Sequence, residues 1–454
     1  MSAHEKFNFN TLEEVEEKAK KLDANVSFSK DLNILGMPIK VNGKEVHNRF
    51  AILPMEGCDS GRDGSPTPLV ARRYERFFQG GAGLVWWEAN AVTEEGRANE
   101  LQMMLTDANL PLFRALLADL RQKALSLNGY APISILQLTH SGRYSRPIGH
   151  KAAPIVPQHD PILDPRVGLS SSSPVCTDSY LESLIPKYVH SAVLAKEAGF
   201  DGVDVKACHR YLLSELLASH TRAGKYGGSF ENRIALILQI IKAIKEAVGD
   251  DFIIACRFNV FDAHPYPYGF GEDKKDMWKF APAEPMEFVR RIIDAGVSLL
   301  SNSAGNPYYI FPQVTRPFDL SSMGIPVPEE HPLESIARLF AFTATIQEAA
   351  GNVPVIGNGY SWLRQFLPYA AAANIRAGHC AMVGLGRQAI AYPNAPNDVL
   401  NNGVMEKNKC CVTCSKCTQI MRDHGTTGCV VRDSAVYAPL YKKFRAEAEE
   451  RENG

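Results

Sequence analysis

Short apolar runs alternate with longer amphipathic stretches along most of the chain. The apolar runs have few polar interruptions, which is typical of strands buried on both faces of a sheet. Because such strands need a covering layer outside the sheet, the pattern predicts a parallel sheet of the α/β class. Strands are expected at 50–55, 83–89, 132–138, 202–207, 252–258, 297–303, 353–359 and 381–386.

Helical periodicity fills the intervals between these strands. Eight strand–helix units in roughly 350 residues favour a closed (β/α)8 TIM barrel. The alternative is an open, doubly wound sheet, but no G-x-G-x-x-G run follows the first strand. Helices are expected at 68–79, 110–128, 182–198, 231–248, 284–295, 333–350 and 361–373.

The ends of the chain lie outside this repeat. Residues 1–31 are expected to form an N-terminal helical arm, because Thr11 and Glu14 form a capping box at the start of a helix over 11–22. The barrel itself is expected to span 32–395.

A small cysteine-bearing segment over 396–454 completes the predicted organisation. The run PNAPND, which begins at Pro393, is typical of a linker to this segment. A charged helix is expected at 438–452.

Two long connections, 139–181 and 259–283, are rich in proline and follow strand ends. Barrels carry their active sites at that end, and loops of this length usually have a function. These two loops are therefore expected to wall the active site and to set its selectivity.

Composition narrows the class of protein. The 454 residues are 45% hydrophobic and 22% charged, and the formal net charge is −1. No basic excess indicates a nucleic-acid partner, and no apolar run reaches the ~18–20 residues of a membrane helix. The first ten residues lack the apolar core of a secretory signal. Ten cysteines without a disulfide pattern fit a reducing cytoplasm, where the protein is expected to reside.

Four of those cysteines are regularly spaced near the C-terminus. Two residues separate Cys411 from Cys414 and Cys414 from Cys417, and eleven separate Cys417 from Cys429. Three staggered thiolates and one from a returning chain form the ligand set of a 4Fe-4S cluster. Zinc is the alternative, although its sites usually pair two Cys-x-x-Cys knuckles. The role of the adjacent Cys410 stays open.

Polar side chains stand at successive strand ends, where a buried strand would carry apolar residues. They are Gln137, Lys206, His209, Tyr211 and Arg257. Because the carboxyl ends of barrel strands meet at one opening, these groups are expected to form one site.

The last two strands end in glycines. Backbone N–H groups at a helix start attract phosphate, and an arginine adds a charge-assisted bond. A phosphate site is therefore expected at Gly357, Gly359, Gly386 and Arg387.

The run GFDGVDVKACHRYLLSELLASHTRAGKYGGSFENR resembles the signature segment of the old yellow enzyme family, which are FMN-bearing barrels. NRFAILPM, GGAGLVWWEANAV, ILQLTHSGR and GLGR agree with it. With the cysteines, the chain is similar to the iron–sulfur branch of 2,4-dienoyl-CoA reductase and trimethylamine dehydrogenase. The resemblance implies FMN and a 4Fe-4S cluster.

The resemblance also implies roles for single residues. Pro54 and Met55 would lie beside the flavin ring, Ala89 near its carbonyl edge and Gln137 at its pyrimidine side. Arg257 would stabilise charge at the N1–C2 edge of reduced flavin. The phosphate would be held by Gly359, Gly386 and Arg387. The substrate would be bound by Lys206 and His209 and protonated by Tyr211.

Two residues depart from the family pattern. Lys206 replaces the first histidine of the substrate-binding pair, and Glu56 replaces a small polar or thiol residue beside the flavin. A carboxylate there would repel reduced flavin, so Glu56 either points away or lowers the flavin potential.

The expected function is an ene-reductase that transfers hydride from reduced FMN to the C=C bond of an α,β-unsaturated carbonyl compound. Electrons would come from NAD(P)H or, through the cluster, from a ferredoxin-like protein or an NAD(P)H-flavin subunit. The chain ends soon after Cys429, which favours a separate redox partner. A homo-oligomer is compatible with the sequence.

Three alternatives stay open. An amine dehydrogenase or demethylase would pass electrons outward through the cluster, and Trp86, Trp87, Tyr308 and Tyr309 could form an aromatic bowl for its cation. An electron-transfer subunit of a larger complex would have no small substrate. A barrel stapled by zinc would have an unrelated function.

Overall fold

Eight parallel strands close into a barrel in the computed structural model, which describes residues 4–309 and 312–453. Each strand pairs with the next along the chain, and β10 pairs with β3 to close the ring. The strands are β3 (Phe50–Ile52), β4 (Leu84–Ala91), β5 (Ile133–Thr139), β6 (Gly202–Val205), β7 (Ile253–Phe261), β8 (Leu299–Ala304), β9 (Val355–Gly357) and β10 (Met382–Leu385). The predicted TIM barrel is confirmed.

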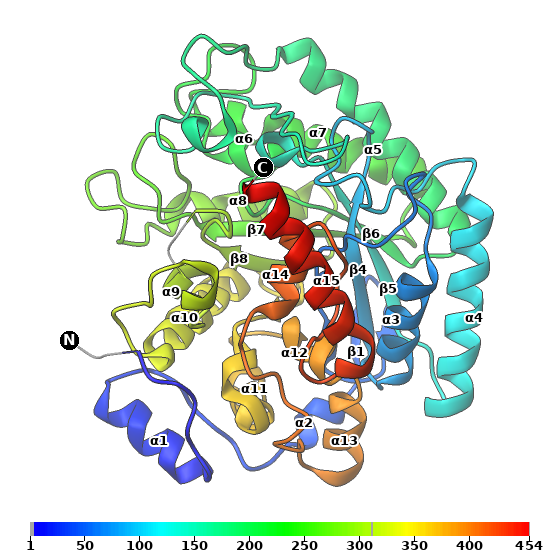
Figure 1. Ribbon diagram of the computed structural model, residues 1–454, viewed down its shortest axis with the longest axis vertical. Helices are drawn as coiled ribbons and strands as arrows, with labels where there is room; N and C mark the ends of the chain where they lie inside the picture. Colours follow the sequence, from blue (N-terminus) through cyan, green and yellow to red (C-terminus); the bar gives the residue numbers. More distant parts are fainter. Residues whose placement is uncertain (1–3, 310–311, 454) are drawn as a thin grey trace.

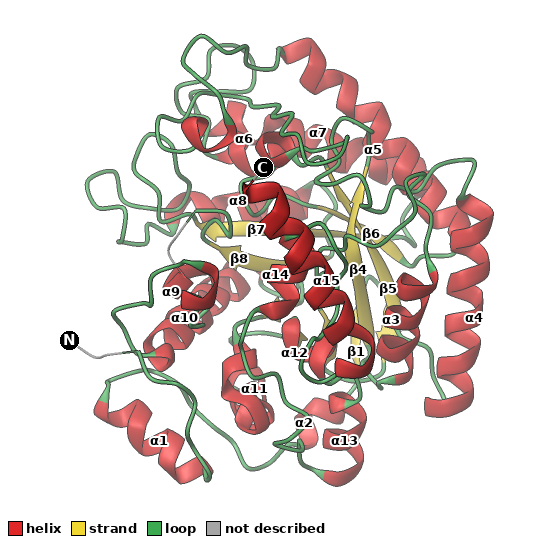
Figure 2. Cartoon of the chain, viewed as in Figure 1, coloured by secondary structure: helices red, strands yellow, loops and turns green. Residues whose placement is uncertain are grey.

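Helices surround the barrel in the order that the sequence predicted (Figures 1 and 2). Thr67, Thr177 and Ser229 each accept a hydrogen bond from a backbone N–H and so begin a helix. The outer helices are α3 (Pro68–Gln79), α4 (Leu110–Asn128), α5 (Asp178–Ala198), α7 (Phe230–Val248), α8 (Ala283–Asp294), α10 (Pro332–Ala350) and α11 (Leu367–Arg376). Shorter helices are α2 (Asn33–Gly36), α6 (Leu212–Leu217), α9 (Pro312–Thr315) and α12 (Arg387–Ala391).

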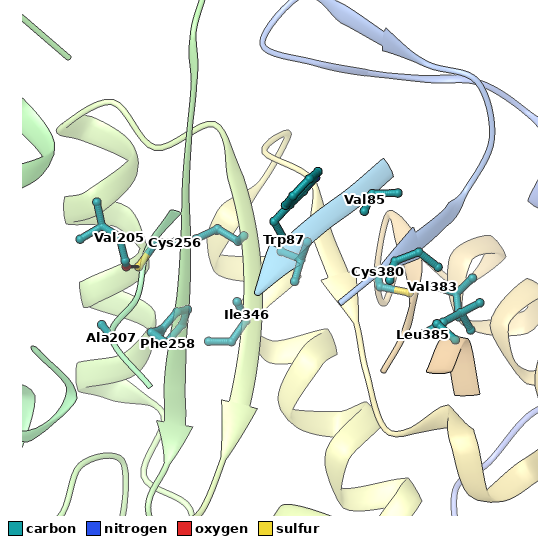
Figure 3. Close-up of a cluster of buried hydrophobic side chains, with 14 of the residues drawn as sticks. Val85, Trp87, Val205, Ala207, Cys256, Phe258, Ile346, Cys380, Val383 and Leu385 are labelled. Carbon is teal, nitrogen blue, oxygen red and sulfur yellow. Dashed lines mark hydrogen bonds between the residues drawn. The ribbon is translucent and has the colours of Figure 1, made fainter. Parts of the chain in front are cut away.

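Two apolar layers hold this arrangement together. One fills the space between strands and helices, where Trp87, Phe258 and Ile346 lie (Figure 3). The other fills the barrel interior. A hairpin of β1 (Ile39–Val41) and β2 (Lys44–Val46) adds Val41 and Val46 to the interior layer. The sequence pattern did not predict this hairpin, whose strands are only three residues long.

The predicted linker at PNAPND is wrong. Residues Ala395–Asn402 form α13, with Ala395, Pro396 and Val399 buried. Proline is tolerated in the first turn of a helix, where its missing N–H has no partner to lose. The side-chain amide of Asn397 donates to the Gln79 carbonyl at 2.8 Å, so α13 packs on the barrel near the end of α3.

The N-terminal arm also packs on the barrel. Its helix α1 (Leu12–Lys21) has the predicted capping box and buries Leu12, Val15 and Ala19. Before the helix, the Phe7 ring lies 5.3 Å from the Trp362 ring, edge to face. The arm is therefore a covering layer.

The C-terminal segment contains α14 (Lys416–Arg422) and α15 (Ser434–Asn453), which lie across the front of the molecule in Figure 1. Arg72 and Arg76 of α3 both pair with Asp433, at 2.7 and 2.5 Å. In the described part of the chain, no helix is long and apolar enough to span a membrane.

Candidate active site

A cavity lies at the carboxyl ends of the strands. The structure places eight of the predicted site residues on its wall: Pro54, Met55, Gln137, Lys206, His209, Arg257, Gly359 and Arg387. Ala89 lies behind the wall, at a bulge of β4 beside Gln137. Gly386 is close to Met55, because a Cβ there would meet the Met55 sulfur at 3.3 Å. Gly357 is buried in β9.

Asp204 fixes the side chains around the barrel mouth. Its carboxylate accepts from the Gln137 amide at 2.6 Å, from the Trp86 indole at 3.1 Å and from the Arg257 backbone N–H at 2.8 Å. Burial raises the pKa of Asp204 to about 7. The Arg257 guanidinium donates to the Pro54 carbonyl at 3.2 Å, which ties β7 to the segment after β3.

Lys206 and His209 follow β6 and line the cavity, and Tyr211 is buried beside Lys206. The Lys206 ammonium lies 3.7 Å from the centre of the Tyr211 ring, a cation–π contact. Nε2 of His209 lies 3.1 Å from the Ser303 hydroxyl, and its backbone N–H donates to Asn259 at 3.1 Å. The three groups that the sequence singled out for substrate chemistry are thus neighbours.

Burial sets the protonation of these groups. It lowers the pKa of Lys206, against the opposing attraction of Glu56. It also lowers the pKa of His209 well below 6.5, together with nearby cations such as Arg257. The imidazole is therefore neutral at pH 7. Burial and the charge of Glu56 raise the pKa of Tyr211 well above 10, so this tyrosine is a neutral phenol.

Glu56 faces Tyr211. The Tyr211 hydroxyl lies 2.7 Å from each oxygen of the Glu56 carboxylate. The Tyr308 hydroxyl lies 2.8 Å from that of Tyr211 and 3.4 Å from Glu56. Two phenols and one carboxyl group thus form a single hydrogen-bonded cluster.

A buried ionic network holds the turn that carries His209 and Tyr211. Arg210 pairs with Asp262 at 3.0 Å and with Asp160 at 3.3 Å. These carboxylates belong to the two long loops that were expected to wall the site, and that expectation is wrong for this cavity, since none of its described lining residues comes from either loop. The network continues through Arg143, which pairs with Glu215 and Asp164. Sequence reasoning missed it, because the partners are far apart in the chain.

The cavity contains cations suited to a phosphate. Arg257, Arg316 and Arg387 each line it, and the Nε atom of each has no hydrogen-bond partner among the described residues. Burial, followed by the like charges of Arg387 and Arg422, lowers the pKa of Arg316 well below its usual value. An anion bound among these arginines would stabilise them. The residues therefore fit the phosphate of FMN, and Arg316 is a cation that sequence reasoning missed.

Gly359 shapes the same end of the cavity. Its φ of 92° lies in the left-handed region, and a Cβ would lie 3.1 Å from the Leu339 side chain. The adjacent Asn358 amide donates to the Asn302 carbonyl at 2.8 Å. The turn after β9 is thus fixed close to the arginines.

The four predicted cluster cysteines lie near one another. Burial and the neighbouring Cys417 raise the pKa of the Cys411 thiol to about 12. Burial raises the pKa of Cys417, with smaller contributions from Cys429 and Cys414, while Arg387 opposes it. Cys417 also lines the cavity. The thiols therefore gather beside the barrel opening.

Among the residues that the structure describes, no three His, Cys, Asp or Glu groups are arranged to hold a metal ion. The 4Fe-4S cluster and the alternative zinc site therefore both stay predictions for these cysteines. Cys410 faces elsewhere, since its thiol donates to the Glu406 carbonyl at 3.4 Å.

A buried ion triad ties the cysteine segment to the barrel. Arg73 of α3 pairs with Asp59 at 2.7 Å and with Glu88 of β4 at 2.6 Å. Asp59 accepts from the Thr426 hydroxyl at 2.7 Å, and Arg73 donates to the Thr427 carbonyl at 3.1 Å. Burial raises the pKa of Glu88 to about 7.

The aromatic bowl suggested for a cationic amine does not form from the four candidates. The indole of Trp86 points into the barrel toward Asp204, and Trp87 stacks on Tyr74 at 3.7 Å outside it. Arg166 lies over the Tyr309 ring at 4.8 Å. Of the four, Tyr308 lines the cavity.

A family model agrees with the barrel and its site. The NADH:flavin oxidoreductase / NADH oxidase family matches residues 35–282, more than half of the chain. The chain belongs to this family. It is therefore a flavin-dependent oxidoreductase, as the resemblance to old yellow enzyme predicted.

Relatives within the NADH:flavin oxidoreductase family extend the match. An NADH oxidase from Thermoanaerobacter brockii is 28% identical over 380 residues, which are 83% of this chain and 52% of the relative. A cinnamate reductase from Clostridium sporogenes is 24% identical over 422 residues, which are 91% of this chain and 60% of the relative. The chain thus spans about half the length of the first and three fifths of the second.

A solved structure supports the fold. The complex of 2-naphthoyl-CoA reductase with 2-naphthoyl-CoA matches with a TM-score of 0.69 at 20% identity. The match covers 91% of this chain and 58% of the reductase chain. At this identity, the likeness shows the shared barrel fold alone.

Proposed function

We propose that this chain is an FMN-dependent ene-reductase that reduces the C=C bond of an α,β-unsaturated carbonyl compound. We also propose that Cys411, Cys414, Cys417 and Cys429 hold a 4Fe-4S cluster that exchanges electrons with the flavin. The name of the relative from Clostridium sporogenes, cinnamate reductase, supports this reaction class.

The observation that carries the proposal is the group formed by Lys206, His209 and Tyr211 beside the cavity. It combines a buried cation, a neutral imidazole and a buried phenol within one short segment. A carbonyl oxygen needs the first two as its charge grows, and the α-carbon needs the third as a proton donor.

FMN would be held at its phosphate by Arg387, Arg316 and the Asn358–Gly359 turn, and at its ring by Gln137 and Arg257. When bound, it would supply hydride to the β-carbon. Lys206 and His209 orient the carbonyl oxygen and stabilise the negative charge that develops on it. Tyr211 donates its hydroxyl proton to the α-carbon. The segments 303–308, 315–318 and 417–427, which contribute residues to the cavity wall, would exclude water and define the shape of the substrate.

The charge of the cavity favours an anionic substrate. Arg257, Arg316 and Arg387 are assigned to FMN. Lys206 and Arg422 then remain for the substrate, with one carboxylate, Glu56, among the described lining residues. An unsaturated carboxylate or a thioester with a phosphate-bearing tail would match this field.

The same cations argue against the outward direction of electron flow. A methylated ammonium would meet Lys206 where an amine dehydrogenase needs aromatic faces. An electron-transfer subunit without a small substrate would not need Tyr211 as a proton donor. Both alternatives are therefore less favoured than the ene-reductase.

Anaerobic purification tests the cofactors, and anaerobic titration tests the reaction. We expect one FMN and four iron and four sulfide ions per chain by chemical quantification. We expect dithionite-reduced enzyme to be reoxidised by cinnamate or 2-cyclohexenone. We expect trimethylamine to leave the oxidised flavin unreduced. Reduction of the oxidised flavin by trimethylamine would overturn the proposed direction, and a colourless protein would overturn the cofactors.

A further inference from the structure

The cavity proposed to hold FMN, the flavin-side cavity, has Glu56 on its wall. The Glu56 carboxyl group faces Tyr211, the proposed proton donor. Among the described residues that line this cavity, Glu56 is the sole carboxylic acid. Both of its oxygens lie 2.7 Å from the Tyr211 hydroxyl. Lys206 contacts the face of the Tyr211 ring and not its hydroxyl, which stays available for hydrogen bonds to other groups.

Glu56 also lines a second cavity. The lining of that cavity combines polar side chains, among them Arg146, Arg166 and His424, with the apolar Ala98, Leu163, Val167 and Met421. A carboxyl group shared by both cavities can accept a proton from water on one side and deliver it on the other.

Tyr211 needs such a supply. Once it has protonated a substrate carbon, it is left as a phenolate in a buried place beside a carboxylate, which is unfavourable. Of the residues that the structure describes, two lie within hydrogen-bond distance of its hydroxyl, Glu56 and Tyr308. Burial and Glu56 raise the pKa of Tyr308 as well, which makes the Tyr308 phenol a poor proton source for Tyr211.

We propose that Glu56 acts through Tyr211 as a proton relay between the second cavity and the substrate. The inference rests on the proposed ene-reductase function and extends it, because it assigns a role to the residue that departs from the family pattern.

The protons and electrons balance. Hydride forms the new C–H bond at the β-carbon, and the electron pair of the C=C bond moves to the α-carbon. The Tyr211 O–H bond breaks as the α-carbon takes its proton. The Glu56 carboxylate then takes a proton from water in the second cavity, which leaves hydroxide there, and passes this proton to the phenolate oxygen. The net change is the addition of one hydride and one proton.

The test separates hydride transfer from protonation. Reduction of 1-nitrocyclohexene leaves a nitronate, which absorbs in the ultraviolet until its carbon is protonated. Successive turnovers of the holoenzyme with excess dithionite are followed, at the flavin band in the first turnover and at the nitronate band in the later ones. Tyr211 gives its own proton to the first nitronate and needs the relay only before the next. In Glu56→Gln, we expect flavin reoxidation within about threefold of wild type and nitronate protonation slowed at least about tenfold, since glutamine cannot pass on a proton.

Glu56→Asp is the matched control. It keeps the acid and should restore protonation to within about threefold of wild type, whereas a merely structural role would slow both phases in both variants. Equal protonation rates in wild type and Glu56→Gln overturn the relay.

If 1-nitrocyclohexene, cinnamate and 2-cyclohexenone all fail to reoxidise the reduced flavin, the proposed function falls and the relay falls with it.

Discussion

Lys206 carries a charge where water barely reaches, since 2% of its surface is exposed. Burial makes its ammonium easier to deprotonate, and Glu56 partly offsets this. His209, three residues later, is neutral for the same reason. At this edge of the cavity, anion binding therefore depends on the protonation of one lysine.

A pH titration of ligand binding tests that dependence. Below the Lys206 pKa, which lies under 10.5, the ammonium can bind a carboxylate, and above it this attraction is lost. We expect the Kd of cinnamate, measured by perturbation of the oxidised flavin spectrum, to rise with pH through this range. Lys206→Gln should bind cinnamate about ten- to a hundredfold more weakly at neutral pH and show no such rise.

Methyl cinnamate provides the control, because it has the same ring and no charge. Its affinity should be nearly independent of pH in both proteins. A wild-type titration that is the same for the acid and the ester would contradict the role of Lys206.

Among elements, the segment after β6 shows what the sequence could predict. Eight strands and the helices between them follow from apolar periodicity, because each element buries a continuous face. The positions of Lys206, His209 and Tyr211 at a strand end follow from the same pattern. The Arg210 network does not, because Asp160 and Asp262 come from loops without periodicity and meet Arg210 only in the folded chain.

The C-terminal elements show a second limit. Proline and asparagine usually break helices, so the run PNAPND predicts a linker. The structure forms α13 there, because its proline lies in the first turn, where proline is tolerated. Arg316 was missed because an arginine in an irregular segment looks the same whether it faces solvent or a buried cavity.

The assignment of Cys417 as a cluster ligand, and of Cys410 as a non-ligand, can be tested by substitution. Cys417→Ser should lose most of the bound iron and sulfide, because a cluster needs its thiolate, while FMN content stays within error of wild type. Cys410→Ser is the matched control and should keep its iron, because the Cys410 thiol faces the Glu406 carbonyl. Iron, sulfide and flavin are quantified after anaerobic purification. Loss of iron in Cys410→Ser with retention in Cys417→Ser would reverse the ligand assignment.

For the whole molecule, the cysteine segment, the barrel opening and the flavin-side cavity adjoin one another. The Asp59–Arg73–Glu88 triad fixes the segment to β4 and α3, and Cys417 reaches the cavity wall. Two routes for electrons into the flavin are therefore proposed: hydride from NADH or NADPH within the cavity, and single electrons from a partner protein through the cluster.

Stopped-flow spectroscopy separates the two routes. We expect NADH or NADPH alone to bleach the flavin in wild type and equally in Cys417→Ser, because hydride does not pass through the cysteine segment. Reduced ferredoxin should bleach the flavin in wild type only. Failure of both nucleotides with wild type would leave the partner protein as the proposed donor.

The β1–β2 hairpin has a consequence for the order of events. It fills the amino-terminal end of the barrel with Val41 and Val46, so in the described chain the interior is solid on that side. A nicotinamide and an unsaturated acid would then have to enter from the same side and stack against the same face. Each would have to dissociate before the other could bind, so turnover would follow ping-pong kinetics.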